Sequence, residues 1–528
     1  MKITGLDVEF APLPAPVPIW YGQVTPAQWQ AAATAVRDEG GRLVALWAGK
    51  AIESIADKAM NTRAEAVFVA YVTLQGLFWL ALPLTVVDGV PVYPDLAAVF
   101  PAASRLQRAA ADLSGIHADG ASDQRPWLNH GAWAADAPPL LQNLRALPEP
   151  VPGALVDYPF VRVEGDGVHE IAVGPVHAGI IEPGHFRFSV VGEKVLRLEQ
   201  RLGYTHKGIE QRMTQLAPLQ AQRLAARVSG DSTVAYAWAY CMALESAAQA
   251  VIPPRAAWLR ALLLERERIA NHLGDLGALG NDAAFAFALA QFSRLREDWL
   301  RDAKAAFGHR LTMDVIVPGG VNTDLDSGQI AQMAQACERL GREVHKLQDI
   351  FEAHAGLQDR LMTTGRVTPA LAAQLGLTGL AGRASSQTWD LRCDHPFAPY
   401  DRLQVTMATH HNGDVAARVA VRFDEVFESL RLLQGMLREL PAGPVHHGLT
   451  LPEGPSRGLG WVEGWRGEVL VALELAGADQ GWRIERCHLH DPSWQNWPVL
   501  EHAIMGNIVA DFPLINKSFN LSYSGQDL

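Results

Sequence analysis

The chain has 528 residues, of which 48% are hydrophobic and 19% are charged, as in a globular protein with a substantial buried core. Its formal net charge of -12 excludes a basic surface built to neutralise nucleic-acid phosphates. Its four cysteines form no C-x-x-C pair, which argues against a local metal or redox pair and indicates a reduced, cytoplasmic protein.

The first 135 residues are predicted to form a small α/β domain. Helical patterns cover residues 27–37 and 51–58, and another helix is expected to begin near Tyr93. The uncharged stretch 67–87 is as long as a membrane span, but Gly76 and Pro83 interrupt it, so two core strands are predicted instead. The chain is therefore expected to have no transmembrane helix of its own. Residues 136–153 are rich in proline and predict a linker.

Residues 154–528 are predicted to form a second, mainly helical domain. Short strands are expected over 158–195 and 456–490, an irregular tail from Asp491, and helices over most of the rest. The clearest helix spans 327–354, where apolar residues recur every three or four positions and include Cys337, which is therefore predicted to be buried. Further helices are expected over 219–250, from Pro254, over 284–304 and over 414–440. The predicted fold class is α+β, with a helical bundle flanked by small sheets.

A series of short motifs runs through the second domain. They are Gly174-Pro175-Val176-His177, Glu182-Pro183-Gly184-His185-Phe186-Arg187, His206-Lys207-Gly208-Ile209-Glu210, residues 267–273, residues 317–321 and Trp389-Asp390-Leu391-Arg392. In these motifs the chain resembles the large subunits of nickel–iron hydrogenases, above all the formate hydrogenlyase type, and the quinone-site subunit of respiratory complex I. The first domain, with Tyr93-Pro94-Asp95 and residues 127–133, is similar to the accessory subunit that neighbours the quinone-site subunit in complex I.

The resemblance implies four cysteine ligands for nickel and iron, and this chain has lost all of them. Where the family has R-V-C-G-I-C, the chain reads Arg227-Val228-Ser229-Gly230-Asp231-Ser232, and where it has C-x-x-C near the C-terminus, the chain has Ser522 and Gly525. Serine hydroxyls and a glycine are poor substitutes for the soft thiolates that hold these metals. We therefore expect no metal at the degenerate ligand positions Ser229, Ser232, Ser522 and Gly525.

Other residues of the family's cavity are present. By position, Arg466 matches the hydrogenase arginine over the metal's diatomic ligands, and Glu210 matches the glutamate near the metal. His185 and Asp282 match the histidine and aspartate that the resemblance places at the complex I quinone headgroup, where they could deliver a proton. Arg227 stands where complex I has the quinone tyrosine, a departure that argues against quinone reduction.

The sequence indicates no cofactor held by this chain itself. It has no phosphate-binding loop and no cysteine cluster for an iron–sulfur centre. The histidine pairs at 410–411 and 446–447 lack metal-ligand spacing, and adjacent residues of a strand point to opposite faces. A structural turn is the favoured interpretation of His488 and His490, which would share one face of an extended strand.

The resemblance implies a subunit of an oxidoreductase complex, attached peripherally to the cytoplasmic side of the inner membrane. The expected partners are a small subunit with a 4Fe-4S cluster and antiporter-like and other integral membrane subunits, with a quinone as a further ligand. The chain would form the cavity beside that cluster and couple electron transfer to ion translocation. The alternative is a structural or assembly subunit with a collapsed cavity, and a working hydrogenase with unusual ligands is the least favoured reading.

Overall fold

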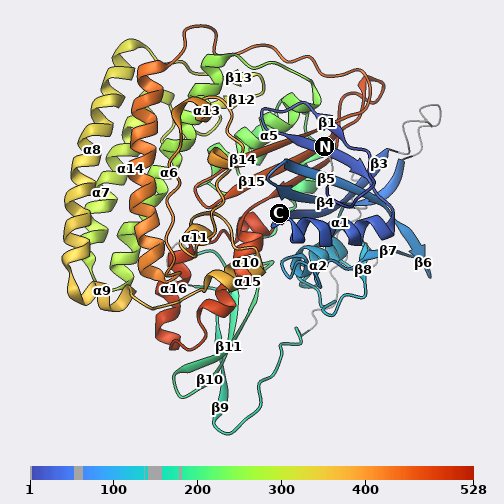
Figure 1. Ribbon diagram of the computed structural model, residues 1–528, viewed down its shortest axis with the longest axis horizontal. Helices are drawn as coiled ribbons and strands as arrows, with labels where there is room; N and C mark the ends of the chain where they lie inside the picture. Colours follow the sequence, from blue (N-terminus) through green and yellow to red (C-terminus); the bar gives the residue numbers. More distant parts are fainter. Residues whose placement is uncertain (1–2, 53–62, 136, 141–156, 178–180) are drawn as a thin grey trace.

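The computed structural model describes residues 3–52, 63–135, 137–140, 157–177 and 181–528. A helical bundle lies on one side and an N-terminal sheet on the other, with a small three-stranded sheet projecting below (Figure 1). No helix in these ranges is long and apolar enough to cross a membrane. The predicted α+β fold class is confirmed.

The N-terminal domain is built on a five-stranded sheet in the order β1-β2-β5-β4-β3. Strands β2 and β5 pair in parallel, and the other neighbours pair antiparallel. The uncharged stretch forms most of β4 and β5, as predicted, and the side chains of residues 66–72 and 77–82 are at most 2% exposed, whereas its end forms the exposed strand β6. The elements are β1 (Ala11–Leu13), β2 (Ile19–Gln23), α1 (Pro26–Asp38), β3 (Arg42–Ile52), β4 (Arg63–Thr73), β5 (Gly76–Pro83), β6 (Thr85–Val87), β7 (Val90–Pro94), α2 (Ala103–Ser114) and β8 (His117–Asp119).

Two local predictions in this domain are wrong. The helix expected near Tyr93 begins at Ala103, because residues 90–94 form β7, which pairs with β6 and β8. The helix expected over 51–58 is wrong at residues 51–52, which end β3, and its remainder lies outside the described residues. Most of the predicted linker also lies outside them.

The bundle of the second domain consists of long helices, of which α6 packs against α7 and α14, and α8 packs against α14 (Figure 1). The apolar seam of α8 is buried, including Cys337 at 2% exposure, as predicted. The helices are α3 (Ile209–Met213), α4 (Gln222–Ala225), α5 (Thr233–Ala247), α6 (Pro254–Asp282), α7 (Ala286–Phe307), α8 (Ser327–Ala353), α9 (Ala355–Leu361), α10 (Pro369–Leu375), α11 (Gly379–Arg383), α12 (Leu391–Asp394), α13 (Tyr400–Leu403) and α14 (Val415–Glu439).

Small sheets flank the bundle, as expected. They are β9 (Val168–Val173), β10 (His185–Val191) and β11 (Lys194–Arg201), the pair β12 (Ile316–Val317) and β13 (Gly320–Val321), and β14 (Ser456–Glu463), β15 (Glu468–Leu475) and β16 (Ile484–His490). The tail is not irregular, because it forms α15 (Ser493–Ala503) and α16 (Phe512–Phe519). Helix α5 lies directly on β14, where a Cβ at Gly460 would come within 1.8 Å of the carbonyl oxygen of Ala239.

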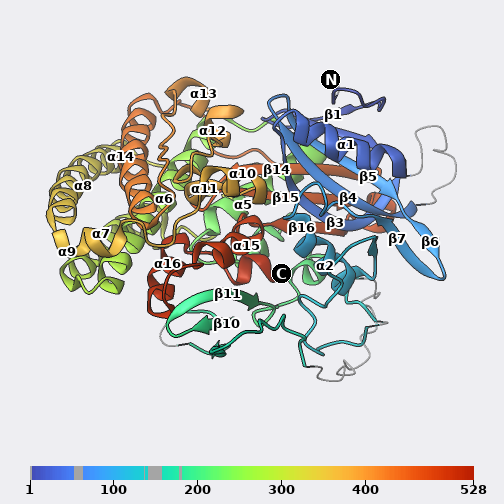
Figure 2. The ribbon, with the colours of Figure 1, turned by 60° about the horizontal axis from the view of Figure 1, so that its bottom comes forward.

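The N-terminal sheet lies beside β14, β15 and β16 (Figure 2), and polar side-chain contacts join the two domains. The Arg486 side chain of β16 donates to the carbonyl of Ala48 in β3 at 2.8 Å. Arg105 of α2 pairs with Glu501 of α15 at 2.8 Å, and the Trp127 indole donates to Gln526 at 3.0 Å. The N-terminal domain therefore packs against β16, α15 and the C-terminal tail, which also carries Ser522 and Gly525.

Candidate functional site

The first degenerate ligand pair lies on the loop between α4 and α5. Ser232 is the residue just before α5, and Ser229 donates its hydroxyl to the Asp231 carboxylate between them. Arg227, at the start of this loop, forms a two-pronged ion pair with Asp314 at 2.5 and 2.7 Å. The loop is thus fixed by an ion pair to Asp314 and by a hydrogen bond between two of its own residues.

Arg466 lies in the tight turn between β14 and β15 and reaches this loop. Its Nη1 donates to Asp231 at 3.0 Å and to the Ser232 hydroxyl at 3.2 Å, and its Nε donates to the Asn520 carbonyl at 2.6 Å. The guanidinium also lies over the Trp465 ring, 4.0 Å from its centroid. The arginine that the resemblance places over a metal therefore binds a carboxylate supplied by the degenerate motif itself.

Asp231 and Arg466 form an ion pair in which each group stabilises the charged state of the other. Burial by itself would raise the pKa of Asp231, but the Arg466 charge and its hydrogen bonds outweigh burial and lower that pKa to about 2. The pKa of Arg466 is raised, because Asp231 and the neighbouring Asp491 offset its burial. Both groups are therefore charged at neutral pH.

The second degenerate pair lies beside Asp491, which follows β16. The Gly525 backbone donates to the Ser522 hydroxyl at 2.8 Å, and Asp491 accepts a hydrogen bond from the Tyr236 hydroxyl at 2.8 Å. Since Tyr236 is on the first turns of α5, just after Ser232, one helix connects the two degenerate pairs. The structure thus brings the four lost ligand positions into one region around α5, Arg466 and Asp491.

The residues present do not fit a nickel–iron centre. Such a centre needs soft thiolates, whereas this region offers neutral hydroxyls that are already hydrogen-bonded. A Cβ at Gly525 would lie 2.6 Å from Asp491 Oδ2, so a cysteine side chain has no room there. Within the described residues, no group of three or more His, Cys, Asp or Glu side chains could hold a metal ion.

Glu210 lies in a separate cluster at the contact between the two domains. Its carboxylate binds His488 Nδ1 at 2.8 Å, the Leu489 backbone N–H at 3.1 Å and Arg486 at 3.0 Å. Burial would raise the pKa of Glu210, but Arg486 and His488 outweigh it and lower the pKa to about 2. The His488 ring in turn stacks on Trp47 of β3, 4.7 Å between centroids. Glu210 therefore fixes the His488 ring that packs against the N-terminal domain.

The two quinone candidates are not joined in the described structure. His185 begins β10, where its Nε2 accepts from Arg187 at 3.4 Å and its ring lies 5.2 Å from Phe160. Burial and the Arg187 charge lower the pKa of His185. Asp282 is the exposed last residue of α6, and no hydrogen bond or ion pair between the described residues connects it with His185. The functional role of both residues stays a prediction.

The sequence did not identify the charged residues of the helix bundle that support the segment bound by Arg466. Asn520 donates to Asp275 at 2.7 Å, and Asp275 also pairs with Arg422 at 2.8 Å and with Lys517 at 3.3 Å. These contacts continue the hydrogen bond from Arg466 to the Asn520 carbonyl into the helix bundle. The sequence feature that pointed to charged contacts in this region was Asp231, an acidic residue inside a motif where the family has isoleucine.

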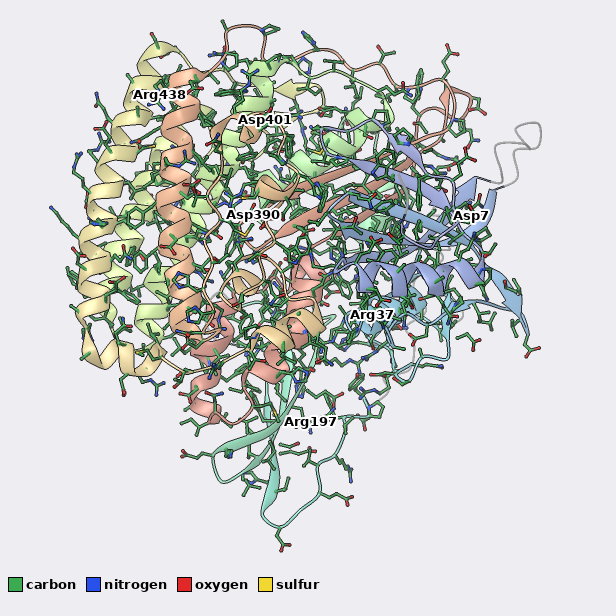
Figure 3. All side chains as sticks on the ribbon, in the orientation of Figure 1. Asp7, Arg37, Arg197, Asp390, Asp401 and Arg438 are labelled. Atoms are coloured by element: carbon green, nitrogen blue, oxygen red, sulfur yellow. The ribbon has the colours of Figure 1, made fainter. Side chains whose placement is uncertain are left out.

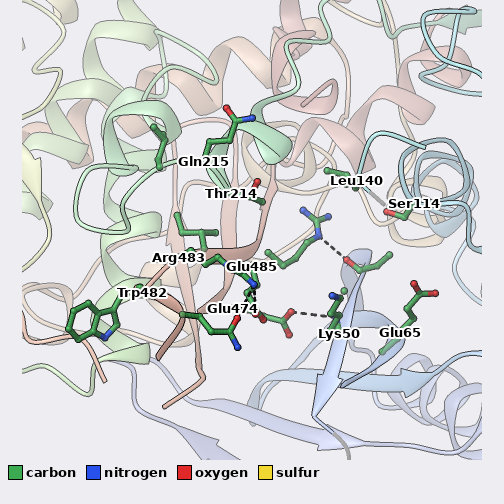
Figure 4. A pocket seen from close by; sticks show the side chains of 18 of the residues that line it. Lys50, Glu65, Ser114, Leu140, Thr214, Gln215, Glu474, Trp482, Arg483 and Glu485 are labelled. Carbon is green, nitrogen blue, oxygen red and sulfur yellow. Dashed lines mark hydrogen bonds and ion pairs between the residues drawn. The ribbon is translucent and has the colours of Figure 1, made fainter. Parts of the chain in front are cut away.

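A solvent-filled cleft separates parts of the two domains away from Arg466 (Figure 4). It measures about 760 Å³ and is lined on one side by residues such as Lys50 and Glu65 and on the other by Gln215, Trp482 and Arg483. Charges of both signs face each other across it. The mixed lining gives no single ligand class, and none of the predicted site residues lines the cleft.

A helical bundle flanked by small sheets, with the motif residues Arg466, Ser232 and Ser522 gathered around α5, defines the class of hydrogenase-related large subunits. Family models for the respiratory-chain NADH dehydrogenase 49 Kd and 30 Kd subunits match residues 279–457 and 22–146, respectively. Formate hydrogenlyase subunit 5 of Escherichia coli is 32% identical over 456 residues, covering 85% of this chain and 79% of that protein. The chain therefore belongs to the family of hydrogenase and complex I large subunits.

One further relative agrees with this assignment, and one solved structure shares the fold. The C/D subunit of the NADH-quinone oxidoreductase of Bacteroides thetaiotaomicron is 29% identical and covers 61% of this chain and 62% of that protein. A chain from the structure of the membrane-bound sulfane sulfur reductase, an archaeal respiratory membrane complex, aligns with a TM-score of 0.64 at 24% identity. It covers 69% of this chain and 99% of that chain, which supports the fold.

Proposed function

We propose that this chain is the non-nickel large subunit of a membrane-associated, complex I-like redox complex. In that complex it would lie on the cytoplasmic side of the inner membrane, beside a small subunit with a 4Fe-4S cluster and above antiporter-like and other integral membrane subunits. The proposal is supported by the relatives, which include formate hydrogenlyase subunit 5 and the C/D subunit of an NADH-quinone oxidoreductase. The chain would couple electron transfer at the partner's cluster to ion translocation.

The observation that carries the non-nickel role is the Asp231–Arg466 ion pair. The guanidinium that would lean over a metal is bound on two edges by Asp231, Ser232 and Asn520. Electrons leaving a neighbouring cluster would therefore find no metal in this chain to reduce protons. Quinone reduction has weaker support, since His185 and Asp282 are not joined and Arg227 is bound to Asp314.

The same ion pair also favours a second candidate, a structural or assembly subunit in which the cavity has collapsed. The two candidate functions differ in whether they require charged side chains in the protein interior. A scaffold gains little from buried charges, since replacing a buried ion network by apolar side chains is often neutral or stabilising. The buried charges around Arg383, with 0% exposure, therefore support the redox role.

Co-purification tests the proposed complex directly. A tagged chain is purified from mildly solubilised native membranes, and its partners are identified by mass spectrometry and its metals by elemental analysis. We expect an iron–sulfur small subunit with antiporter-like membrane proteins, and iron without nickel. Recovery of the chain alone from the soluble fraction, or nickel in stoichiometric amount, would disprove the proposal.

A second experiment separates the two candidates. In the assembled complex, Asp231→Asn removes the charge beside Arg466 while keeping the shape of the side chain. If the chain is a redox subunit, the complex should lose turnover and keep all of its subunits. The reason is that the substitution changes the electrostatic field beside the 4Fe-4S cluster of the proposed partner. Unchanged turnover with normal assembly favours the scaffold. Glu170→Gln is the matched control, because it removes a surface ion pair with Arg187 on the projecting sheet.

A further inference from the structure

Three carboxylates converge on one guanidinium in the interior between the bundle and the sheets. Arg383, at the end of α11, lies 2.6 Å from Glu425, 3.0 Å from Glu463 and 3.8 Å from Asp390. All four side chains are at most 2% exposed. Figure 3 places Asp390 well inside the molecule, beside α6 and α14.

The neighbouring guanidiniums are already engaged. Arg392 pairs with Asp390 at 2.6 Å and with Glu265 at 3.1 Å. Arg268 pairs with Glu265 at 3.2 Å and donates to the carbonyls of Glu463 and Gly464 at 2.8 and 3.0 Å. The group, here named the Arg383 cluster, contains the four carboxyls Glu265, Asp390, Glu425 and Glu463 and the three guanidiniums Arg268, Arg383 and Arg392.

Such an excess of carboxyls in a buried cluster favours one bound proton, because an uncompensated charge is costly away from water. Glu265 accepts from Tyr400 and Ser429 at 2.8 and 2.6 Å besides its two arginines, and Glu425 accepts from His272 at 2.7 Å. Asp390 is bound by Arg392 through both oxygens. These three carboxylates are well compensated as anions.

Glu463 is the least compensated of the four. It receives one bond from Arg383 at 3.0 Å and one from the Leu391 backbone at 3.2 Å. Burial and the charges of Asp390 and Glu468 raise the pKa of Glu463 to about 7, against the opposing effect of Arg383 and Arg268. Glu468 on β15, which raises the pKa of Glu463, pairs with Arg42 and accepts a hydrogen bond from the Trp461 indole.

His272 of α6 faces Glu425 and is a second candidate for the proton of the Arg383 cluster. Its Nε2 faces Glu425 and its Nδ1 has no hydrogen-bond partner within the described structure. Burial lowers the pKa of His272, with Arg422 and Arg268 acting in the same direction. The imidazole is therefore neutral at pH 7, and the proton belongs on Glu463.

Glu463 is connected to the former metal position by a short path along the chain. It is the last residue of β14, and the turn that follows carries Trp465 and Arg466. The Trp465 indole donates to the Asp231 carbonyl at 2.8 Å, and Arg466 binds the Asp231 carboxylate. A change in the charge of Glu463 therefore acts on Arg383, on Arg268 and, through the carbonyls that Arg268 binds, on this turn.

We propose that Glu463 is a proton-binding site that gains and releases one proton in the neutral pH range, and that its charge sets the position of the turn bearing Arg466. The step is a simple ionisation, in which the carboxyl O–H bond breaks and the proton passes to water. The use of this proton in energy coupling rests on the proposed function. The ionisation itself does not, so it can be tested in a complex that shows no turnover.

Infrared difference spectroscopy of the purified full-length chain in its complex, between pH 6 and pH 8, reads the ionisation directly. We expect the wild type to lose a protonated-carboxyl band over this range, and Glu463→Gln to lose only the smaller part that Glu267 contributes, because burial raises the pKa of Glu267 to about 8. Glu463→Asp, which keeps an ionisable group, should show the band at a shifted frequency. Absence of any such band in the wild type, or its full persistence in Glu463→Gln, overturns the proposal.

Thermal unfolding gives a second measurement with a defined sign. Because the folded pKa of Glu463 lies above the value of about 4.3 for an unfolded chain, its ionisation weakens folding as the pH rises from about 4.5 to 7. The Tm of Glu463→Gln relative to wild type should therefore rise over that range and then level off. Glu265→Gln is the matched control, since the pKa of Glu265 is lowered and its Tm deficit should stay constant. Parallel pH profiles for Glu463→Gln and wild type would contradict the proposal.

Discussion

The region around Arg466 and the region around His185 both keep family residues, but only the first keeps them in contact. Arg466 binds Asp231 through two hydrogen bonds and is 6% exposed, whereas no bond between the described residues joins His185 to Asp282. In the first region the chain itself supplies the negative charge that the buried guanidinium needs. In the second region the two matching positions lie on separate elements, at the start of β10 and the end of α6.

The difference shows that a retained motif residue can keep its place while changing its partner. A buried arginine needs a counter-charge once a metal and its thiolates are gone, so Asp231 is a physical requirement of keeping Arg466. An exposed aspartate has no such requirement, because water solvates it. The Asp231–Arg466 pair should therefore be sensitive to substitution, and Asp282 should not.

Removing the guanidinium should give the largest effect. Arg466→Met leaves the Asp231 carboxylate without its partner and should lower the free energy of unfolding by about 3 kcal/mol, the lower end for a buried pair, because 33% of the Asp231 side chain is exposed. Urea unfolding of the purified chain measures the loss. As the pKa of Asp231 is lowered to about 2, this stabilisation is present at neutral pH and fades as the pH falls from about 4 toward 2.

A double-mutant cycle is the control for that prediction. Asp231→Ile restores the residue that the family has at this position, and combined with Arg466→Met it removes both charges. The double variant should be more stable than Arg466→Met alone, since no charge remains unpaired. Strict additivity of the two single effects would show that the two residues are not coupled.

Restoring a cysteine at the fourth ligand position should have an intermediate effect. Gly525→Cys places a Cβ 2.6 Å from Asp491 Oδ2 and should cost about 2 kcal/mol through overpacking. Ser522→Cys, which exchanges only the hydroxyl for a thiol, is the matched control and should cost less. Cysteines at all four degenerate positions should still bind no nickel by elemental analysis while Asp491 is present. Nickel binding by that quadruple variant would show that the region can reopen.

The sequence predicted the elements whose patterns are local and missed those set by long-range contacts. Periodicity placed α8 within one residue, and the interruptions of the uncharged stretch separated β4 from β5. The segment near Tyr93 has proline and aspartate typical of a helix start, but its backbone pairs with β6 and β8, a contact that local pattern does not carry. The tail was predicted to be irregular, yet it forms α15 and α16, in which Pro498 lies inside α15 and Pro513 in the first turn of α16.

The sequence predicted which residues form the candidate site, but it did not predict their hydrogen-bond and ion-pair partners. The motif alignment identified Arg466 and the degenerate ligand positions, and the structure brings these together. It could not show that Asp231 pairs with Arg466, or that Glu210 binds His488 and Arg486. These pairings depend on side chains that are more than 200 residues apart in the chain, such as Asp231 and Arg466 at a separation of 235.

The smallest effect is expected at Asp282, because the comparison of the two regions predicts that Asp282 and His185 act independently. Asp282→Asn changes an exposed helix end and should alter the free energy of unfolding by less than about 0.5 kcal/mol. His185→Ala should cost more, because His185 is 9% exposed and packs against Phe160. Because no described contact joins the two residues, the double variant should equal the sum of the single effects within about 0.5 kcal/mol, both in urea unfolding and in turnover of the complex. A coupling of more than about 1 kcal/mol in turnover alone would mean that the partners bring His185 and Asp282 into one site, and the quinone role would then deserve priority over the ion-paired region.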